Sequence, residues 1–180
     1  AHGSQDSMPG EERTALLDES VAMARRLDDP RALIESLRLH LSVDRTPARI
    51  GWRVETLDEM LRLAQRVDDK QLTLDVLAFR IYDLVALGDV ASWSRDLDAH
   101  QRVADEIHEP FYTYCARAMT VARAINSGDF HEAERLAGEA HAIGQPLGVD
   151  NVDGVLGVQM FTIRREQGRL QEVAPFVRHF

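Results

Sequence analysis

Histidine and glutamate lie close together in the segment HEAER, at residues 131–135, a pattern that suggests zinc chemistry. A helical zinc hydrolase site needs His-Glu-x-x-His, because this spacing puts two imidazoles on one face of a helix. The segment lacks the second histidine, and the other histidines have no spacing typical of metal ligands. We therefore expect no metal site, and imidazoles that are exposed or partly buried.

Two glycines in DGVLGVQ, at residues 153–159, raise the question of a phosphate-binding loop. Such a loop needs to be rich in glycine and to lead from a strand into a helix. Here Gly154 and Gly157 fall inside a helical pattern with no strand before it, which favours close helix packing. No Gly-x-x-x-x-Gly-Lys-Ser/Thr occurs, so we expect no ATPase site and no cofactor.

Cys115 is the single cysteine, near the start of an apolar helical pattern with Arg117 close by. A reactive thiolate needs a cationic or helix N-terminal setting, but a buried and inert thiol is the commoner fate of a free cysteine. The carboxylates recur at turns, where they cap helices, and no pair is set apart for acid–base catalysis. We therefore expect a protein that is not an enzyme.

The elements that would position any site repeat every forty residues. One motif is a glycine turn, found at Gly88, Gly128 and Gly168. A second motif aligns without gaps at the same period, as ARRLDDP (24–30), AQRVDDK (64–70) and ADEIHEP (104–110). Two motifs that share one period of this length indicate a helical repeat.

Each period contains two turns, and each turn has a physical explanation. Glycine ends the first helix of each pair, because it adopts the left-handed conformation without strain. In the other turn, Asp29 and Asp69 can cap the next helix, and Glu109 before Pro110 repeats the arrangement. Ala133 is the small residue expected where the two helices of a pair cross.

The sequence predicts an all-α fold, a right-handed solenoid of stacked helical hairpins with about nine helices. No alternating run bounded by hairpin turns suggests a sheet. Residues 1–4, AHGS, look like a cloning remnant, and residues 5–180 are expected to form a single repeat domain cut from a larger protein. The expected helices are a lone helix at 10–27, then the pairs 31–44 with 46–67, 71–87 with 89–107, 111–127 with 129–147 and, in part, 151–167 with 169–180.

Composition limits the function classes. The formal net charge is −9 and no basic run occurs, which argues against direct nucleic-acid binding. No apolar run is long enough to span a membrane, and no signal peptide opens the chain. One thiol cannot staple a fold, so we expect a reducing, cytoplasmic setting.

The residues Gly128-Asp129-Phe130-x-x-Ala133-x-x-x-Ala137-x-x-Ala140 resemble the second half of a tetratricopeptide (TPR) repeat. The first-helix signature is not matched, and the period is forty residues rather than thirty-four. The chain therefore resembles a TPR-like repeat and not a standard one.

Longer phrases, among them DDPRALIESL and VQMFTIRREQGRLQEV, are similar to the TPR-like region of large multidomain bacterial regulators. These are LuxR-type or maltose-activator-type transcription regulators with an ATPase module, and related adenylate/guanylate cyclase-like proteins. The resemblance implies a region that senses an effector or binds a protein, with the DNA-binding or cyclase domain elsewhere.

In TPR-like superhelices the first helices line the concave face, and polar residues there are the candidates for binding. Arginines could clamp an acidic tail or a phosphate, because the planar guanidinium matches both. The candidates are Arg80, Asp83, Tyr112, Arg117, Arg123 and Arg164. Trp52 and Trp93 are expected to pack between repeats, the alternative being a peptide-binding groove.

We expect the partner to be a protein or peptide segment, or a small effector. One alternative is self-association through the exposed ends of the repeat array, which would form a homo-oligomer. Another is a helical enzyme with its active site in the groove, for which the sequence offers no motif.

Overall fold

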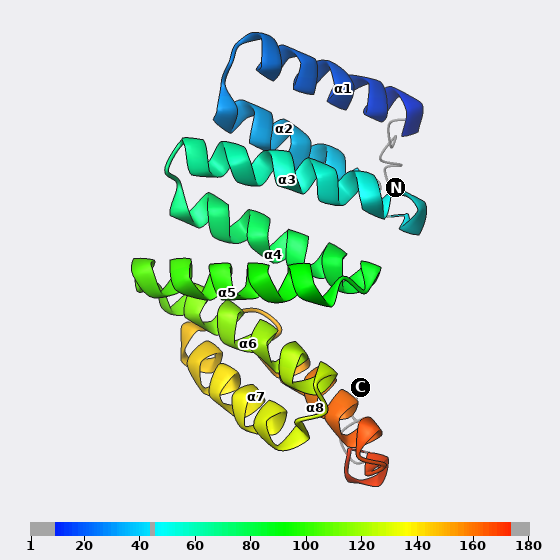
Figure 1. Ribbon diagram of the computed structural model, residues 1–180, viewed down its shortest axis with the longest axis vertical. Coiled ribbons are helices and arrows are strands. Elements are labelled where there is room, and N and C mark those ends of the chain that lie inside the picture. Colours follow the sequence, from blue (N-terminus) through cyan, green and yellow to red (C-terminus); the bar gives the residue numbers. More distant parts are fainter. Residues whose placement is uncertain (1–9, 44–45, 174–180) are drawn as a thin grey trace, which may run out of the picture. The chain divides into compact units, whose positions relative to one another are not determined.

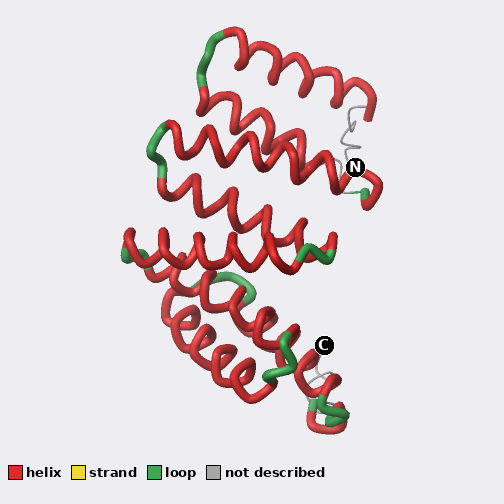
Figure 2. The backbone as a smooth tube through the Cα atoms, viewed as in Figure 1, coloured by secondary structure: helices red, strands yellow, loops and turns green. Residues whose placement is uncertain are grey.

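The structure, a computed structural model, describes residues 10–43 and 46–173 (Figure 1). These residues form eight α-helices and no strand, and the all-α prediction is confirmed (Figure 2). The helices are α1 (Gly10–Arg26), α2 (Pro30–Val43), α3 (Ile50–Arg66), α4 (Lys70–Leu87), α5 (Val90–Ile107), α6 (Pro110–Asn126), α7 (Phe130–Gly144) and α8 (Val152–Glu166). Three 3-10 helices accompany them: η1 (Pro47–Arg49), η2 (Gln145–Leu147) and η3 (Leu170–Glu172).

The chain divides into two compact units, Ala1–Trp93 and Ser94–Phe180. In the first unit, α1 packs on α2, α2 on α3 and α3 on α4, and successive helices run antiparallel (Figure 1). In the second unit, α7 packs on α6 and on α8. Contacts between sequential helices are what a stack of helical hairpins requires, and this prediction is confirmed.

The ninth expected helix, at residues 169–180, is described only at its start. There the chain forms the single 3-10 turn η3 (Leu170–Glu172) instead of an α-helix. Residues 174–180 lie outside the described residues, as do the expected cloning remnant at 1–4 and the residues up to 9. The handedness of the solenoid stays a prediction.

Two kinds of turn connect the helices, and both place one residue in the left-handed conformation. Gly88, Gly128 and Gly168 have φ angles of 74°, 78° and 70°. The other turn uses non-glycine residues, Asp28, Asp68 and His108, with φ angles of 49°, 51° and 56°. Aspartate and histidine tolerate this conformation better than most residues. Each of the two turns therefore has its own left-handed position in the forty-residue period.

Aspartates directly after the left-handed residues cap the helices that follow. The carboxylate of Asp69 accepts from the backbone N–H of Leu72 at 3.0 Å, and Asp29 caps α2 in the same way. Glu109 holds the corresponding position before α6, but its side chain makes no capping hydrogen bond, so the expected repetition is wrong there. The short side chains of Asp, Asn, Ser and Thr suit this position, and Glu is not among them.

Small residues mark the places where helices cross. Ala24, Ala64, Ala104 and Gly144 follow one another at forty-residue intervals, and all four are buried. A Cβ atom on Gly144 would lie 2.7 Å from the Cδ2 atom of Tyr114, so the backbone and the ring are in close contact there. Ala133 is also fully buried, in a core cluster of the second unit that includes Val121, Leu136 and Ile163.

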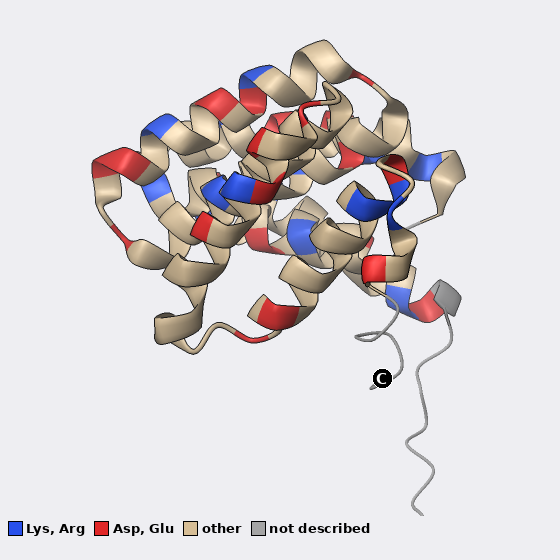
Figure 3. Ribbon diagram, turned by 90° about the horizontal axis from the view of Figure 1, so that it is seen from below, with Lys and Arg blue, Asp and Glu red and all other residues tan. Residues whose placement is uncertain are grey.

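Charged residues of both signs follow one another along the helices (Figure 3). No helix within the described ranges is both long and apolar enough to cross a membrane.

Candidate functional site

The predicted binding residues do not come together in one cluster. Arg80 and Asp83 lie in α4 of the first unit, and the other four lie in α6 and α8 of the second. Every one of the four predicted arginines forms an ion pair with a carboxylate of its own unit: Arg80 with Asp58, Arg117 with Glu139, Arg123 with Asp98 and Arg164 with Glu134. Their charge therefore holds neighbouring helices together.

Part of this pairing repeats with the sequence period. Three aspartates forty residues apart, one each in α1, α3 and α5, accept a hydrogen bond from a side chain on the next helix. The pairs are Asp18 with Nε2 of His40 at 2.9 Å, Asp58 with Nε of Arg80 at 2.6 Å, and Asp98 with Nη1 of Arg123 at 2.6 Å. Sequence reasoning missed this pattern, although the spacing of the aspartates was there to be read.

Arg164 is the most enclosed of the predicted arginines. It is buried, and its Nη1 and Nη2 atoms donate to the two carboxylate oxygens of Glu134 at 2.7 and 2.6 Å. Its Nε atom lies 3.1 Å from an oxygen of Glu172. The hydrogen bonds from Arg164 lower the pKa of the Glu134 carboxyl below its usual value. An acidic ligand would have to compete with two carboxylates for this guanidinium.

Asp83, which is partly buried, forms an ion pair with the buried Arg53, a residue that sequence reasoning did not single out. The Nε and Nη2 atoms of Arg53 donate to the two oxygens of Asp83 at 3.0 and 3.3 Å. The Nη1 atom donates to the backbone oxygen of Leu41 at 2.6 Å. Such an ion pair fixes its surroundings, because removing either partner would leave an uncompensated charge. This pair therefore ties α3 to both α2 and α4.

Above the Arg53–Asp83 pair lies a groove of about 750 Å³, formed by η1, α3 and α4. Two aromatic side chains of α4 line it, Phe79 at 40% and Tyr82 at 65% exposure. The other lining residues are Thr46, Pro47, Ile50, Arg53, Asp83 and Ala86. The lining of the groove combines exposed aromatic surface with the Arg53–Asp83 ion pair.

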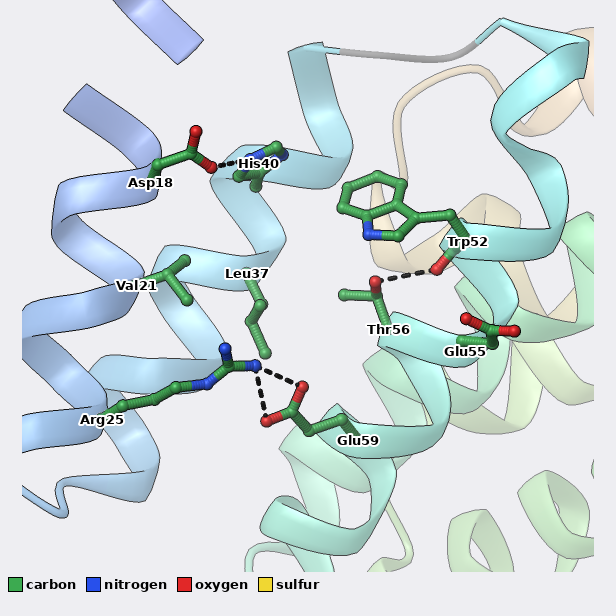
Figure 4. A pocket seen from close by; sticks show the side chains of 9 residues that line it. All are labelled: Asp18, Val21, Arg25, Leu37, His40, Trp52, Glu55, Thr56 and Glu59. Carbon is green, nitrogen blue, oxygen red and sulfur yellow. Dashed lines mark hydrogen bonds and ion pairs between the residues drawn. The ribbon is translucent and has the colours of Figure 1, made fainter. Parts of the chain in front are cut away.

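A smaller cavity of about 300 Å³ lies between α1, α2 and α3 (Figure 4). Its lining residues are Asp18, Val21, Arg25, Leu37, His40, Trp52, Glu55, Thr56 and Glu59. A hydrogen bond between His40 and Asp18 crosses it, and so does the ion pair of Arg25 with Glu59, whose two carboxylate oxygens lie 3.0 and 2.8 Å from Nη2. Trp52 therefore borders a polar cavity and is only half-buried, whereas Trp93 is buried as expected.

His100, in α5, is fully buried, so the expectation of exposed or partly buried imidazoles is wrong for this residue. Its Nδ1 atom has no hydrogen-bond partner. Burial lowers the pKa of His100 from 6.5 to about 4, because removal from water disfavours the charged form. The residue is therefore a neutral imidazole in the core at physiological pH.

The remaining candidates for chemistry are dispersed. Among the residues of known placement, no three or more His, Cys, Asp or Glu side chains form a group that could hold a metal ion. Cys115 is half-buried and packs beside Tyr114, Ala140 and Val152. Tyr112 stacks edge-on against Phe111, with ring centroids 5.3 Å apart.

No model of a protein family matches this chain, and a search of curated proteins finds no match either. The described residues thus establish eight packed α-helices with contacts between sequential hairpins.

Proposed function

We propose that this chain is a non-catalytic scaffold that binds a segment of another protein through the groove on α3 and α4. The observation that carries the proposal is the exposure of Phe79 and Tyr82 beside the Arg53–Asp83 ion pair. Aromatic side chains dominate the energetics of many protein interfaces, and a rigid surface reduces the entropy lost on binding.

The proposal extends to the wider context of the chain. Its forty-residue period and its helix phrases support a TPR-like region of a large bacterial regulator, of the LuxR or maltose-activator type or a related cyclase-like protein. In that setting the region would bind a protein segment or respond to a small effector in the cytoplasm. The negative net charge supports a partner other than nucleic acid.

A photo-crosslinking amino acid at position 82 tests the groove. It should capture a defined segment of a partner protein, which mass spectrometry identifies, while the same amino acid at position 111 should not. The matching synthetic peptide should then bind the parent protein. The double variant Phe79→Ala/Tyr82→Ala should weaken that binding about tenfold or more, as loss of interface anchors does.

Phe111→Ala is the matched control, because Phe111 is an exposed aromatic residue at 44% on α6, outside the groove. It should leave the affinity unchanged. If the double variant bound every captured peptide as tightly as the parent protein does, the groove would not be the binding site.

A second candidate function is self-association through α8. Val158 and Phe161 are 68% and 41% exposed on this helix, and exposed apolar side chains favour contacts between copies. Sedimentation velocity across a range of concentrations should then show a dimer that the double variant Val158→Ser/Phe161→Ser dissociates. A monomer at all concentrations would contradict this candidate.

A further inference from the structure

We infer that the cavity between α1, α2 and α3 binds a guanidinium group. This site goes beyond the proposed groove, with which it shares no lining residue. Its volume of about 300 Å³ lies at the lower end of the range for small-molecule sites. The space therefore suits one side-chain head group or a small guanidine rather than a length of peptide backbone.

The charges around the cavity favour a cation. Three carboxylates line it, Asp18, Glu55 and Glu59, against one guanidinium, that of Arg25. His40 donates from Nε2 to Asp18, and its Nδ1 atom is buried without a partner. Among the residues that line the cavity, carboxylates therefore outnumber guanidinium groups by three to one.

Glu55 is the carboxylate that a cationic guest would meet. Asp18 and Glu59 already accept hydrogen bonds from His40 and Arg25. Among the described residues, Glu55 has no hydrogen-bond or ion-pair partner, and it is exposed. A guanidinium can bind both oxygens of such a carboxylate at once, as Arg25 shows in the same cavity by contacting both oxygens of Glu59.

Trp52 adds a second requirement for the guest. Its ring already packs against the guanidinium of Arg49, 4.4 Å from the ring centroid, and against His40 at 5.1 Å. The indole nitrogen lies on the edge of the ring turned toward Thr56 and the cavity, and it has no acceptor among the described residues (Figure 4). An indole N–H only donates, so the guest that fits best carries a carbonyl oxygen near its guanidinium.

An arginine residue with its flanking amide groups meets both requirements, and its blocked form is the probe. ¹⁵N-labelled protein is titrated with Nα-acetyl-arginine methylamide, and the indole N–H signals of Trp52 and Trp93 are followed by NMR. The Trp52 signal should move in a saturable way, while that of the buried Trp93 serves as an internal control. Glu55→Gln should weaken binding about twofold to fivefold, as the loss of an exposed ion pair does. Glu35→Gln removes an equal charge from the exposed face of α2, where Glu35 pairs with Arg38, and should have no effect.

Two further probes define what is recognised. Nα-acetyl-citrulline methylamide has nearly the same shape without the charge, and it should not bind. n-Butylguanidine has the guanidinium and the same single positive charge without the carbonyl, and it should bind more weakly than blocked arginine.

The inference is overturned if the Trp52 signal stays in place or if citrulline moves it as arginine does. It is equally overturned if the Glu55→Gln and Glu35→Gln variants behave alike. Butylguanidine binding as tightly as blocked arginine would refute the role of the Trp52 N–H and assign the cavity to free small guanidines. Because Phe79 and Tyr82 do not line this cavity, the proposal for the groove and the proposal for the cavity can be refuted independently of each other.

Discussion

The change His100→Met should make the second unit less sensitive to acid. His100 is 1% exposed and lies at the repeat position that Met60 and Ala140 occupy forty residues before and after it. Both of those residues are buried, so methionine suits this position. The variant removes the titratable group from the core and keeps an apolar side chain of similar size.

The direction of the effect follows from which state binds the proton. The imidazole binds a proton near pH 6.5 in the unfolded chain, but only near pH 4 in the folded protein. As the pH falls below 6.5, the unfolded state is protonated first, and the folded state loses stability until the pH passes below about 4. At about 1.4 kcal/mol for each pKa unit, the full loss is about 3 kcal/mol, and about 2 kcal/mol of it has occurred by pH 5.

Urea unfolding followed by circular dichroism measures this loss. The free energy of unfolding is determined for the parent protein and for His100→Met near pH 7.5 and near pH 5. Carboxylates titrate in both proteins, so the informative quantity is the difference between their pH-dependent losses, which should be about 2 kcal/mol. His131→Gln is the control, because His131 is an exposed histidine of the same unit and its replacement should leave the loss unchanged.

Equal losses in the parent protein and in His100→Met would refute the reasoning. They would mean that the imidazole of His100 is protonated as easily in the folded protein as in the unfolded chain. The methionine variant can also be less stable than the parent protein by the same amount at both pH values. This would not contradict the reasoning, because only the difference in unfolding free energy between the two pH values reflects protonation of His100.

Three other substitutions test the structure through the same unfolding measurement. Gly128→Ala should destabilise the protein by about 1–2 kcal/mol, because Gly128 has a φ angle of 78° that alanine adopts with strain. Gly138→Ala should instead stabilise it by about 0.5–1 kcal/mol, because Gly138 lies inside α7 and a Cβ atom there meets nothing within 4 Å. If both glycine variants raised the free energy of unfolding, or both lowered it, the two explanations would be contradicted. Arg53→Met should cost about 1–3 kcal/mol by leaving the partly buried Asp83 carboxylate without its partner. The double variant Arg53→Met/Asp83→Leu should recover most of this loss, and if it did not, the uncompensated charge would not be the cause.

Much of the fold could be predicted because its signals are local. A left-handed glycine ends a helix and an aspartate caps the next one through contacts within a few residues, as at Gly128 and Asp129. The forty-residue period then fixes which segments pair as hairpins. The prediction that an acidic residue before a helix caps it was too general, since Glu109 stands directly before α6 and makes no capping hydrogen bond.

The candidate sites could be predicted only in part. The sequence pointed to Arg80 and Asp83 as polar residues of a first helix, but not to their partners Asp58 and Arg53, which lie 22 and 30 residues earlier in the chain. The burial of His100 was also missed, although the apolar Met60 and Ala140 at the same repeat position were a signal of it.

The helices, their turns and their pairing follow from local signals in the chain, because hydrogen bonds and caps between near neighbours decide these. Which charges are paired and which face a cavity depends on how the helices pack in three dimensions. Asp18, Asp58 and Asp98 occupy one column of the repeat, yet Asp18 and Asp58 pair 22 residues along the chain and Asp98 pairs 25 residues along it, with Arg123. Arg123 thus lies three residues beyond the position that the period would give, and residues three apart on a helix share a face. The crossing of the two helices, and not the sequence period, therefore selects the partner.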